Sequence, residues 1–166
     1  LTGLRLRGGP VFREFFAGLG ATFVNMPAPD VYTALERGTI DGVGWPKVGL
    51  GDISWDKLLK YRVDPGFFAS DAGIIVNLKK WQSLPEAARD LLQQEAIAYE
   101  RRSYEDFTAM SAKADQEMRR TGIEVVTLPD SAATKFRSAA LAVPWERIKA
   151  KSPTNYDQLR AKFFRE

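Results

Sequence analysis

The sequence of 166 residues contains no cysteine and no histidine. Disulfides, thiolate or imidazole metal ligands, and catalytic pairs of serine or cysteine with histidine are therefore excluded. The absence of cysteine is compatible with an oxidising compartment but does not identify one. No pair of acidic residues stands out as a general acid and base, so we expect no enzyme activity, no metal site and no cofactor.

The chain also lacks a strong excess of one charge and a long apolar run. Its 24 basic and 21 acidic side chains give a net charge of +3, and the two signs are mostly interleaved, which is not the pattern of a nucleic-acid-binding surface. No stretch of about eighteen apolar residues is present, and the first residues lack a signal-peptide pattern, so we expect no membrane-spanning segment. A content of 45% hydrophobic and 27% charged residues is typical of a globular protein with one or two cores.

The first 46 residues alternate between strand and helix patterns. Strands are expected at 4–7, 22–25 and 40–46, and helices at 10–20 and 30–38. The turn Gly8-Gly9-Pro10 follows the first strand directly, so backbone N–H groups at the start of the next helix are left unpaired above the sheet. Arg7 ends that strand, and its planar guanidinium can hold a carboxylate through two charge-assisted hydrogen bonds. Arg7, Gly9 and Pro10 therefore form a candidate anion site.

One long helix pattern dominates the rest of the chain. It begins at Ser83, whose spacing from Glu86 is typical of a capping box, and persists to Thr121 before Gly122 ends it. Such a helix would be about 55 Å long, which exceeds a small domain, so we interpret it as a spine between two lobes. Further strands are expected at 61–63, 73–77 and 123–128, and further helices at 131–142 and 155–164, separated by Pro144 and Pro153.

The apolar, β-branched run at 73–77 predicts a buried strand. With these elements the chain divides into three parts. An α/β lobe is expected over 1–82, the spine helix over 83–121, and a C-terminal strand with helices that pack on the lobes over 122–166.

Several segments, in order along the chain, resemble one protein family. They are Gly3-Leu4-Arg5-Leu6-Arg7, Leu19-Gly20-Ala21, Asp30-Val31-Tyr32-Thr33-Ala34-Leu35, Gly38-Thr39-Ile40-Asp41-Gly42, Val76-Asn77, Trp81 and Leu84-Pro85. With this set the chain resembles the solute-binding proteins of tripartite ATP-independent periplasmic (TRAP) transporters, of the C4-dicarboxylate-binding DctP type. The resemblance implies a periplasmic α/β protein of the periplasmic-binding-protein-like class II type, with a long spine helix and C-terminal helices. It also implies a further N-terminal lobe that this sequence does not contain.

The resemblance implies roles for individual residues. Arg7 matches the family arginine that pairs with the ligand carboxylate, and Trp45 stands where relatives similar to 2-oxo-acid binders carry a cleft tryptophan. Gly44 stands where those relatives carry a metal-binding glutamate, so no metal ligand is implied there. Ala28 stands where sialic-acid-binding relatives carry a phenylalanine, which argues against that ligand. Asp71 aligns with a polar cleft position, with a turn residue as an equal alternative.

Together these expectations favour a binding protein that captures a small organic acid between two lobes and delivers it to TRAP membrane permease subunits. Trp45 alone does not distinguish a 2-oxo acid, a hydroxy acid, a dicarboxylate or an aromatic acid. Two alternatives are a ligand-sensing domain of a regulator or receptor, and an α/β enzyme that binds phosphate at Gly8-Gly9, although neither a Walker lysine motif nor Gly-x-Gly-x-x-Gly is present. Exposed apolar surface on an isolated lobe also favours a homodimer.

Overall fold

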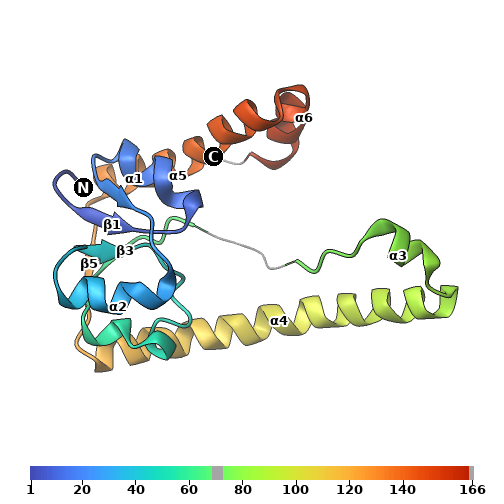
Figure 1. Ribbon diagram of the computed structural model, residues 1–166, viewed down its shortest axis with the longest axis horizontal. Coiled ribbons are helices and arrows are strands. Elements are labelled where there is room, and N and C mark those ends of the chain that lie inside the picture. Colours follow the sequence, from blue (N-terminus) through green and yellow to red (C-terminus); the bar gives the residue numbers. More distant parts are fainter. Residues whose placement is uncertain (69–72, 165–166) are drawn as a thin grey trace.

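A computed structural model describes residues 1–68 and 73–164. In chain order the elements are β1 (Arg5–Arg7), the 3-10 helix η1 (Pro10–Phe12), α1 (Arg13–Gly18), β2 (Thr22–Val24), α2 (Ala28–Glu36), β3 (Gly42–Val43), the 3-10 helices η2 (Gly51–Ile53) and η3 (Trp55–Lys57), β4 (Tyr61–Asp64), α3 (Leu78–Ser83), α4 (Glu86–Arg120), β5 (Glu124–Thr127), α5 (Asp130–Lys151) and α6 (Pro153–Phe163). The predicted α/β fold class is confirmed (Figure 1).

The strands form two small parallel sheets. In the first, β1 is central and pairs with β2 on one side and β3 on the other. In the second, β4 pairs with β5 over its full length, from Tyr61 opposite Glu124 to Asp64 opposite Thr127. Parallel neighbours need a long crossover connection, and the connection from β4 to β5 includes α3 and α4. The carboxyl ends of β1, β2 and β3 consequently meet at one edge of the first sheet.

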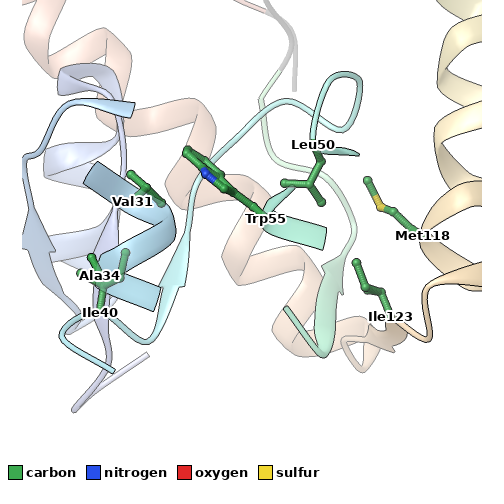
Figure 2. Close-up of a cluster of buried hydrophobic side chains, with 7 residues drawn as sticks. All are labelled: Val31, Ala34, Ile40, Leu50, Trp55, Met118 and Ile123. Atoms are coloured by element: carbon green, nitrogen blue, oxygen red, sulfur yellow. The ribbon is translucent and has the colours of Figure 1, made fainter. Parts of the chain in front are cut away.

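Two hydrophobic clusters hold these elements together. One is aromatic and includes Phe15 and Phe16 of α1, with Phe67 stacked on Phe15 at a ring distance of 4.4 Å and Phe136 of α5 at the edge of both. The other joins α2, the loop after β3, the end of α4 and the start of β5 (Figure 2). Its buried members are Val31, Ala34, Ile40, Leu50, Trp55, Met118 and Ile123.

The helix α4 leaves this body and runs alone for most of its length (Figure 1). Its 35 residues span about 52 Å at about 1.5 Å per residue, and Met118, near its carboxyl end, is its only buried residue. The helix starts at Glu86 because a residue before proline is disfavoured in the helical region, so Leu84 is extended. Ser83 is instead the last residue of α3, where its hydroxyl donates to the Lys80 carbonyl at 2.9 Å. The predicted capping role of Ser83 is wrong.

The prediction of a buried strand at 73–77 is also wrong. This segment pairs with no strand among the described residues, and Ile74 and Ile75 are 89% and 96% exposed. It runs from the body toward α3 at the far end of α4 (Figure 1). An apolar, β-branched run shows that a segment is suited to burial, but burial requires a neighbouring surface, and residues 1–68 and 73–164 place none beside it.

Pro144 does not end a helix as predicted, because α5 continues through it from Asp130 to Lys151. Proline inside a helix costs about 3 kcal/mol through a lost hydrogen bond and a steric clash. Packing on both sides of Pro144 offsets this cost. Val143 packs against the aromatic cluster, and Trp145 contacts Tyr156 of α6 at a ring distance of 6.2 Å.

Candidate functional site

Arg7 lies at the carboxyl end of β1, where it pairs with Val24 of β2 and Val43 of β3. In open parallel sheets, ligands bind beyond the carboxyl ends of the strands. Arg7 is only 7% exposed and is the one polar or charged residue in the buried class within residues 1–68 and 73–164. Burying a charge costs free energy unless a partner compensates it. The contacts of this guanidinium therefore decide what the site can do.

A single backbone oxygen orients the guanidinium. Nε and Nη2 of Arg7 both donate to the carbonyl oxygen of Met26, at 3.2 and 3.0 Å. Met26 follows β2 and precedes α2, so the neighbouring strand supplies this anchor. A guanidinium has five N–H donors, and these two bonds use two of them. The edge formed by Nη1 and Nη2 stays available to a ligand.

Two indoles pack against the same guanidinium. The Arg7 Cζ atom lies 5.4 Å from the ring centre of Trp45 and 5.6 Å from that of Trp55, within the range of cation–π contact. The two indoles touch edge to face, with ring centres 4.8 Å apart. Trp45 follows β3 and is 36% exposed, whereas Trp55 of η3 is 1% exposed. The site thus has one indole that a ligand can reach and one that is enclosed by the core.

No carboxylate in the described part of the chain neutralises Arg7. The acids of this body that form ion pairs bind other cations: Asp41 pairs with Arg5, and Asp64 and Asp115 pair with Arg62. Desolvation by burial lowers the pKa of Arg7, which shows that its surroundings disfavour the charge rather than balance it. An arginine stays protonated in proteins, so the site keeps a positive charge that an anionic ligand can neutralise.

Glycines at two strand ends make room for the aromatic cluster under this edge. A Cβ added to Gly44 would lie 2.8 Å from Cζ of Phe16, and one added to Gly8 would lie 2.9 Å from Cδ2 of Phe12. Real Cβ atoms almost never approach other atoms so closely. Gly44 is the position at which the sequence comparison raised a metal-binding glutamate. The chain has neither a side chain nor space for one at this position, so these residues do not fit a metal held there.

Gly9 and Pro10 follow Arg7 closely in sequence but differ from it in setting. Gly9 caps η1, a 3-10 turn of three residues, and α1 behind it has only six residues, so the expected helix dipole is small. Pro10 lines a groove along α5 together with Arg13, Val143 and Arg147. That groove does not include Arg7 or Trp45. The structure therefore brings Arg7 and Trp45 together and leaves Pro10 facing another surface.

Asp71 lies outside the described residues. Sequence reasoning missed two groups of the site, Trp55 and the carbonyl of Met26. The carbonyl has no side-chain signal in the sequence. Trp55 had one, because a tryptophan in a short helix after a glycine-rich loop is a candidate for burial, but nothing in its spacing pointed to Arg7.

An ion-pair network holds the loop that carries Trp45. Lys47 donates to Asp115 of α4 at 2.9 Å, and Arg62 of β4 donates to the other oxygen of Asp115 at 2.5 Å. Arg62 also pairs with Asp64 at 2.9 Å. Hydrogen bonding by Lys47, followed by that of Arg62, lowers the pKa of Asp115. The network ties this loop to the carboxyl end of α4.

Two further classes of site were sought in the structure. Over 1–68 and 73–164, no three acidic, cysteine or histidine side chains gather closely enough to hold a metal ion. Among the described helices, none combines the length and apolar character needed to span a membrane.

Comparison with known proteins places this geometry in a family. The family model of DctP, described as bacterial extracellular solute-binding protein, family 7, matches residues 1–151. A protein named solute-binding protein from Verminephrobacter eiseniae is 28% identical over 167 residues, covering 97% of this chain and 48% of that protein. The chain spans less than half the length of the curated relatives it matches.

Solved structures show the same fold. A TRAP transporter solute-binding protein from Bordetella bronchiseptica, with copurified calcium and picolinate, matches with a TM-score of 0.76 and 26% identity, over 95% of this chain and 47% of that one. A TRAP periplasmic solute-binding protein from Desulfovibrio salexigens with bound orotic acid matches with a TM-score of 0.76 and 21% identity, over 95% of this chain and 51% of that one. Such proteins are extracytoplasmic binding proteins and not enzymes. The chain belongs to the DctP family of bacterial extracellular solute-binding proteins, the solute-binding proteins of TRAP transporters.

Proposed function

We propose that the full-length protein containing this chain is the extracytoplasmic solute-binding component of a TRAP transporter, which captures a small organic acid and delivers it to the membrane permease subunits. In this proposal the carboxylate of the acid binds Arg7 beside the indole of Trp45. The helix α4 acts as the spine that joins the part of the chain described here to a second lobe, and the ligand lies between the two. Gly9, Pro10 and Asp71 stay predictions of ligand contact.

The observation that carries the proposal is the buried, uncompensated charge of Arg7. Its guanidinium is oriented by the Met26 carbonyl and by two indoles, yet no described carboxylate pairs with it. A ligand carboxylate would accept two charge-assisted hydrogen bonds from the free edge of the guanidinium. Such bonds contribute about 1.5–3 kcal/mol, which favours a carboxylate over an uncharged analogue of the same shape by roughly 10- to 100-fold.

Ligands of the similar structures support an acid. Orotic acid and picolinate, which are bound to the proteins from Desulfovibrio salexigens and Bordetella bronchiseptica, each carry a carboxyl group on a flat ring. The Bordetella structure also holds calcium and is described as a dimer. The position of Gly44 offers this chain no acidic side chain for such an ion, so the proposal uses Arg7 alone to bind the charge. A homodimer stays a prediction.

A thermal-shift screen of the full-length protein tests the proposal. Wild type, Arg7→Ala and Arg37→Ala are heated with a panel of monocarboxylates, dicarboxylates and uncharged analogues. Arg37 is an exposed cation on the same body and controls for the loss of one charge. A ligand at 100 times its Kd stabilises the folded state by about 2.7 kcal/mol, which gives a clear rise in Tm.

The proposal expects a rise in Tm with at least one carboxylate in wild type and in Arg37→Ala, and none in Arg7→Ala. A panel in which no acid raises the Tm of wild type would contradict it. So would a rise of equal size in Arg7→Ala.

A further inference from the structure

Trp55 occupies an unusual place next to the proposed ligand site. It touches Arg7 and Trp45, the two site residues, yet at 1% exposure it is one of the two most deeply buried large side chains in the described part of the chain. It belongs to η3, ten positions after Trp45, and its backbone has no part in the sheet that carries Arg7. Trp55 does not meet a ligand directly, because the core encloses it.

The core fixes Trp55 from behind. Its indole packs in the same cluster as Leu50, Val31 and Met118, which come from separate elements (Figure 2). A close-packed interior holds side chains in defined rotamers. Trp45, by contrast, is 36% exposed and has the core on one side only. The rigid member of the aromatic pair is therefore Trp55, and Trp45 rests its ring against it.

The hydrogen bonds of Arg7 leave one motion unrestrained. Both bonds end on one oxygen, that of Met26, so they anchor one edge of the guanidinium but act at a single point. The plane of the guanidinium can still tilt about that oxygen. The ring of Trp55, centred 5.6 Å from Cζ, limits this tilt and keeps water from that side of the charge. Exclusion of water strengthens an ion pair, because the local dielectric constant falls.

We propose that Trp55 is a positioning residue for carboxylate binding: its buried indole holds the guanidinium of Arg7 and the ring of Trp45 in the arrangement that receives the ligand. This inference rests on the proposed function, since it assumes that Arg7 binds the acid. It adds a residue that the ligand does not touch. Loss of the indole should weaken binding through Arg7 and not only through stability.

The test uses the full-length protein with three variants. Trp55→Leu removes the aromatic ring, Trp55→Phe keeps an aromatic face, and Leu50→Ala makes a cavity in the same cluster while leaving the indole in place. Affinity for the best carboxylate of the thermal-shift panel is measured by isothermal titration calorimetry. The Nε–H resonance of Arg7, assigned by its disappearance in Arg7→Lys, is recorded by NMR without ligand.

The NMR signal reports position independently of ligand binding. An aromatic ring over the guanidinium shifts the Arg7 Nε–H resonance upfield and slows its exchange with water. Trp55→Leu should move the resonance toward the position of a free arginine and weaken carboxylate binding about tenfold, as expected for the loss of a contact worth about 1.4 kcal/mol. Trp55→Phe should restore most of both effects. Leu50→Ala should lower Tm but leave the resonance and the affinity near those of wild type.

The outcomes separate this inference from the proposed function. Equal loss of affinity in Trp55→Leu and Leu50→Ala would overturn the inference, as would an unchanged Arg7 resonance in Trp55→Leu. If Trp55→Leu fails to fold, nuclear Overhauser contacts between Arg7 Nε–H and the Trp55 ring in wild type decide the matter, and their absence counts against it. If wild type binds no carboxylate, the proposed function fails and the inference fails with it, whereas a carboxylate that binds through Arg7 alone leaves the function intact.

Discussion

Arg7 and Met26 are joined by two hydrogen bonds that end on one oxygen: Nε and Nη2 of the arginine both donate to the methionine carbonyl, at 3.2 and 3.0 Å. The two residues end neighbouring parallel strands, since Arg7 closes β1 and Met26 follows β2. This contact uses one edge of the guanidinium and leaves the other free. A structural arginine in a core would be expected to find an acidic partner, and none of the described acids supplies one.

Replacement of Arg7 by methionine should separate stability from binding. Arg7→Met removes two hydrogen bonds but also removes an uncompensated buried charge, so the free energy of unfolding without ligand should change by less than about 1 kcal/mol. Carboxylate binding should be lost. Urea denaturation and calorimetry measure the two quantities. A loss of stability above about 2 kcal/mol would indicate that Arg7 serves the fold instead of a ligand.

Gly44→Ala should destabilise the protein. The added methyl group would lie 2.8 Å from Phe16, whose ring is enclosed by the aromatic cluster and has little room to move. Overpacking of this kind costs about 1–3 kcal/mol. Gly9→Ala is the matched control, because nothing lies within 4 Å of an added Cβ there and Gly9 has an ordinary backbone φ of −68°. Thermal denaturation should show a lower Tm for Gly44→Ala only. Equal Tm values for the two variants would refute this packing argument.

The Arg5–Asp41 pair predicts a pH dependence of stability. Arg5 donates from its side chain and its backbone N–H to Asp41, and these bonds lower the pKa of Asp41 from 3.8 to about 2. Because the folded-state pKa lies below the ordinary value, the pair stabilises the protein at neutral pH. That contribution is lost as the pH falls from 3.8 through about 2.

Asp41→Asn should therefore be less stable than wild type at pH 7, and the difference should shrink below pH 3.8. Asp30→Asn, an exposed acid in the first turn of α2, controls for the loss of a charge. Carboxyl titration by NMR measures the pKa directly. An Asp41 pKa at the ordinary value would show that the bonds to Arg5 are not kept in solution.

Asp115→Asn should weaken the attachment of the Trp45 loop to α4. The carboxylate of Asp115 accepts from both Lys47 and Arg62, but its side chain is 31% exposed, so the loss of stability should stay below about 1 kcal/mol. The loss should also become smaller in about 1 M salt, which screens partly exposed charges. Asp90→Asn, on the exposed surface of the same helix, is the control. Equal denaturation curves for both variants at low salt would contradict this role.

Local patterns in the sequence predicted much of the fold. The strand that ends in Arg7, the helix over most of 86–120 and the strand at 61–64 follow from periodicity and from turn residues such as Gly122 and Pro65. The candidate site could be found in part, because a guanidinium at the carboxyl end of a parallel strand is recognisable from strand pattern and residue type. The structure brings Trp45 to it as expected, at 5.4 Å.

Other features depend on contacts that a sequence pattern does not contain. The run at Ile74 and Ile75 reads as a buried strand, but only a neighbouring surface can bury it. Pro144 reads as a helix end, but packing on both sides carries α5 through it. The anchor of Arg7 is a backbone carbonyl, which every residue has, so no residue type could identify Met26. Trp55 reaches the site through the tertiary fold alone.

The central claim is that Arg7 receives the carboxylate of the ligand. The most direct measurement is a calorimetric double-mutant cycle, in which wild type and Arg7→Met are each titrated with one acid from the panel and with its carboxamide. If the charged group of the ligand meets Arg7, each single change weakens binding about 10- to 100-fold, and the two together cost little more than either alone. Losses that multiply, or an Arg7→Met variant that still prefers the acid as strongly as wild type does, would contradict the account.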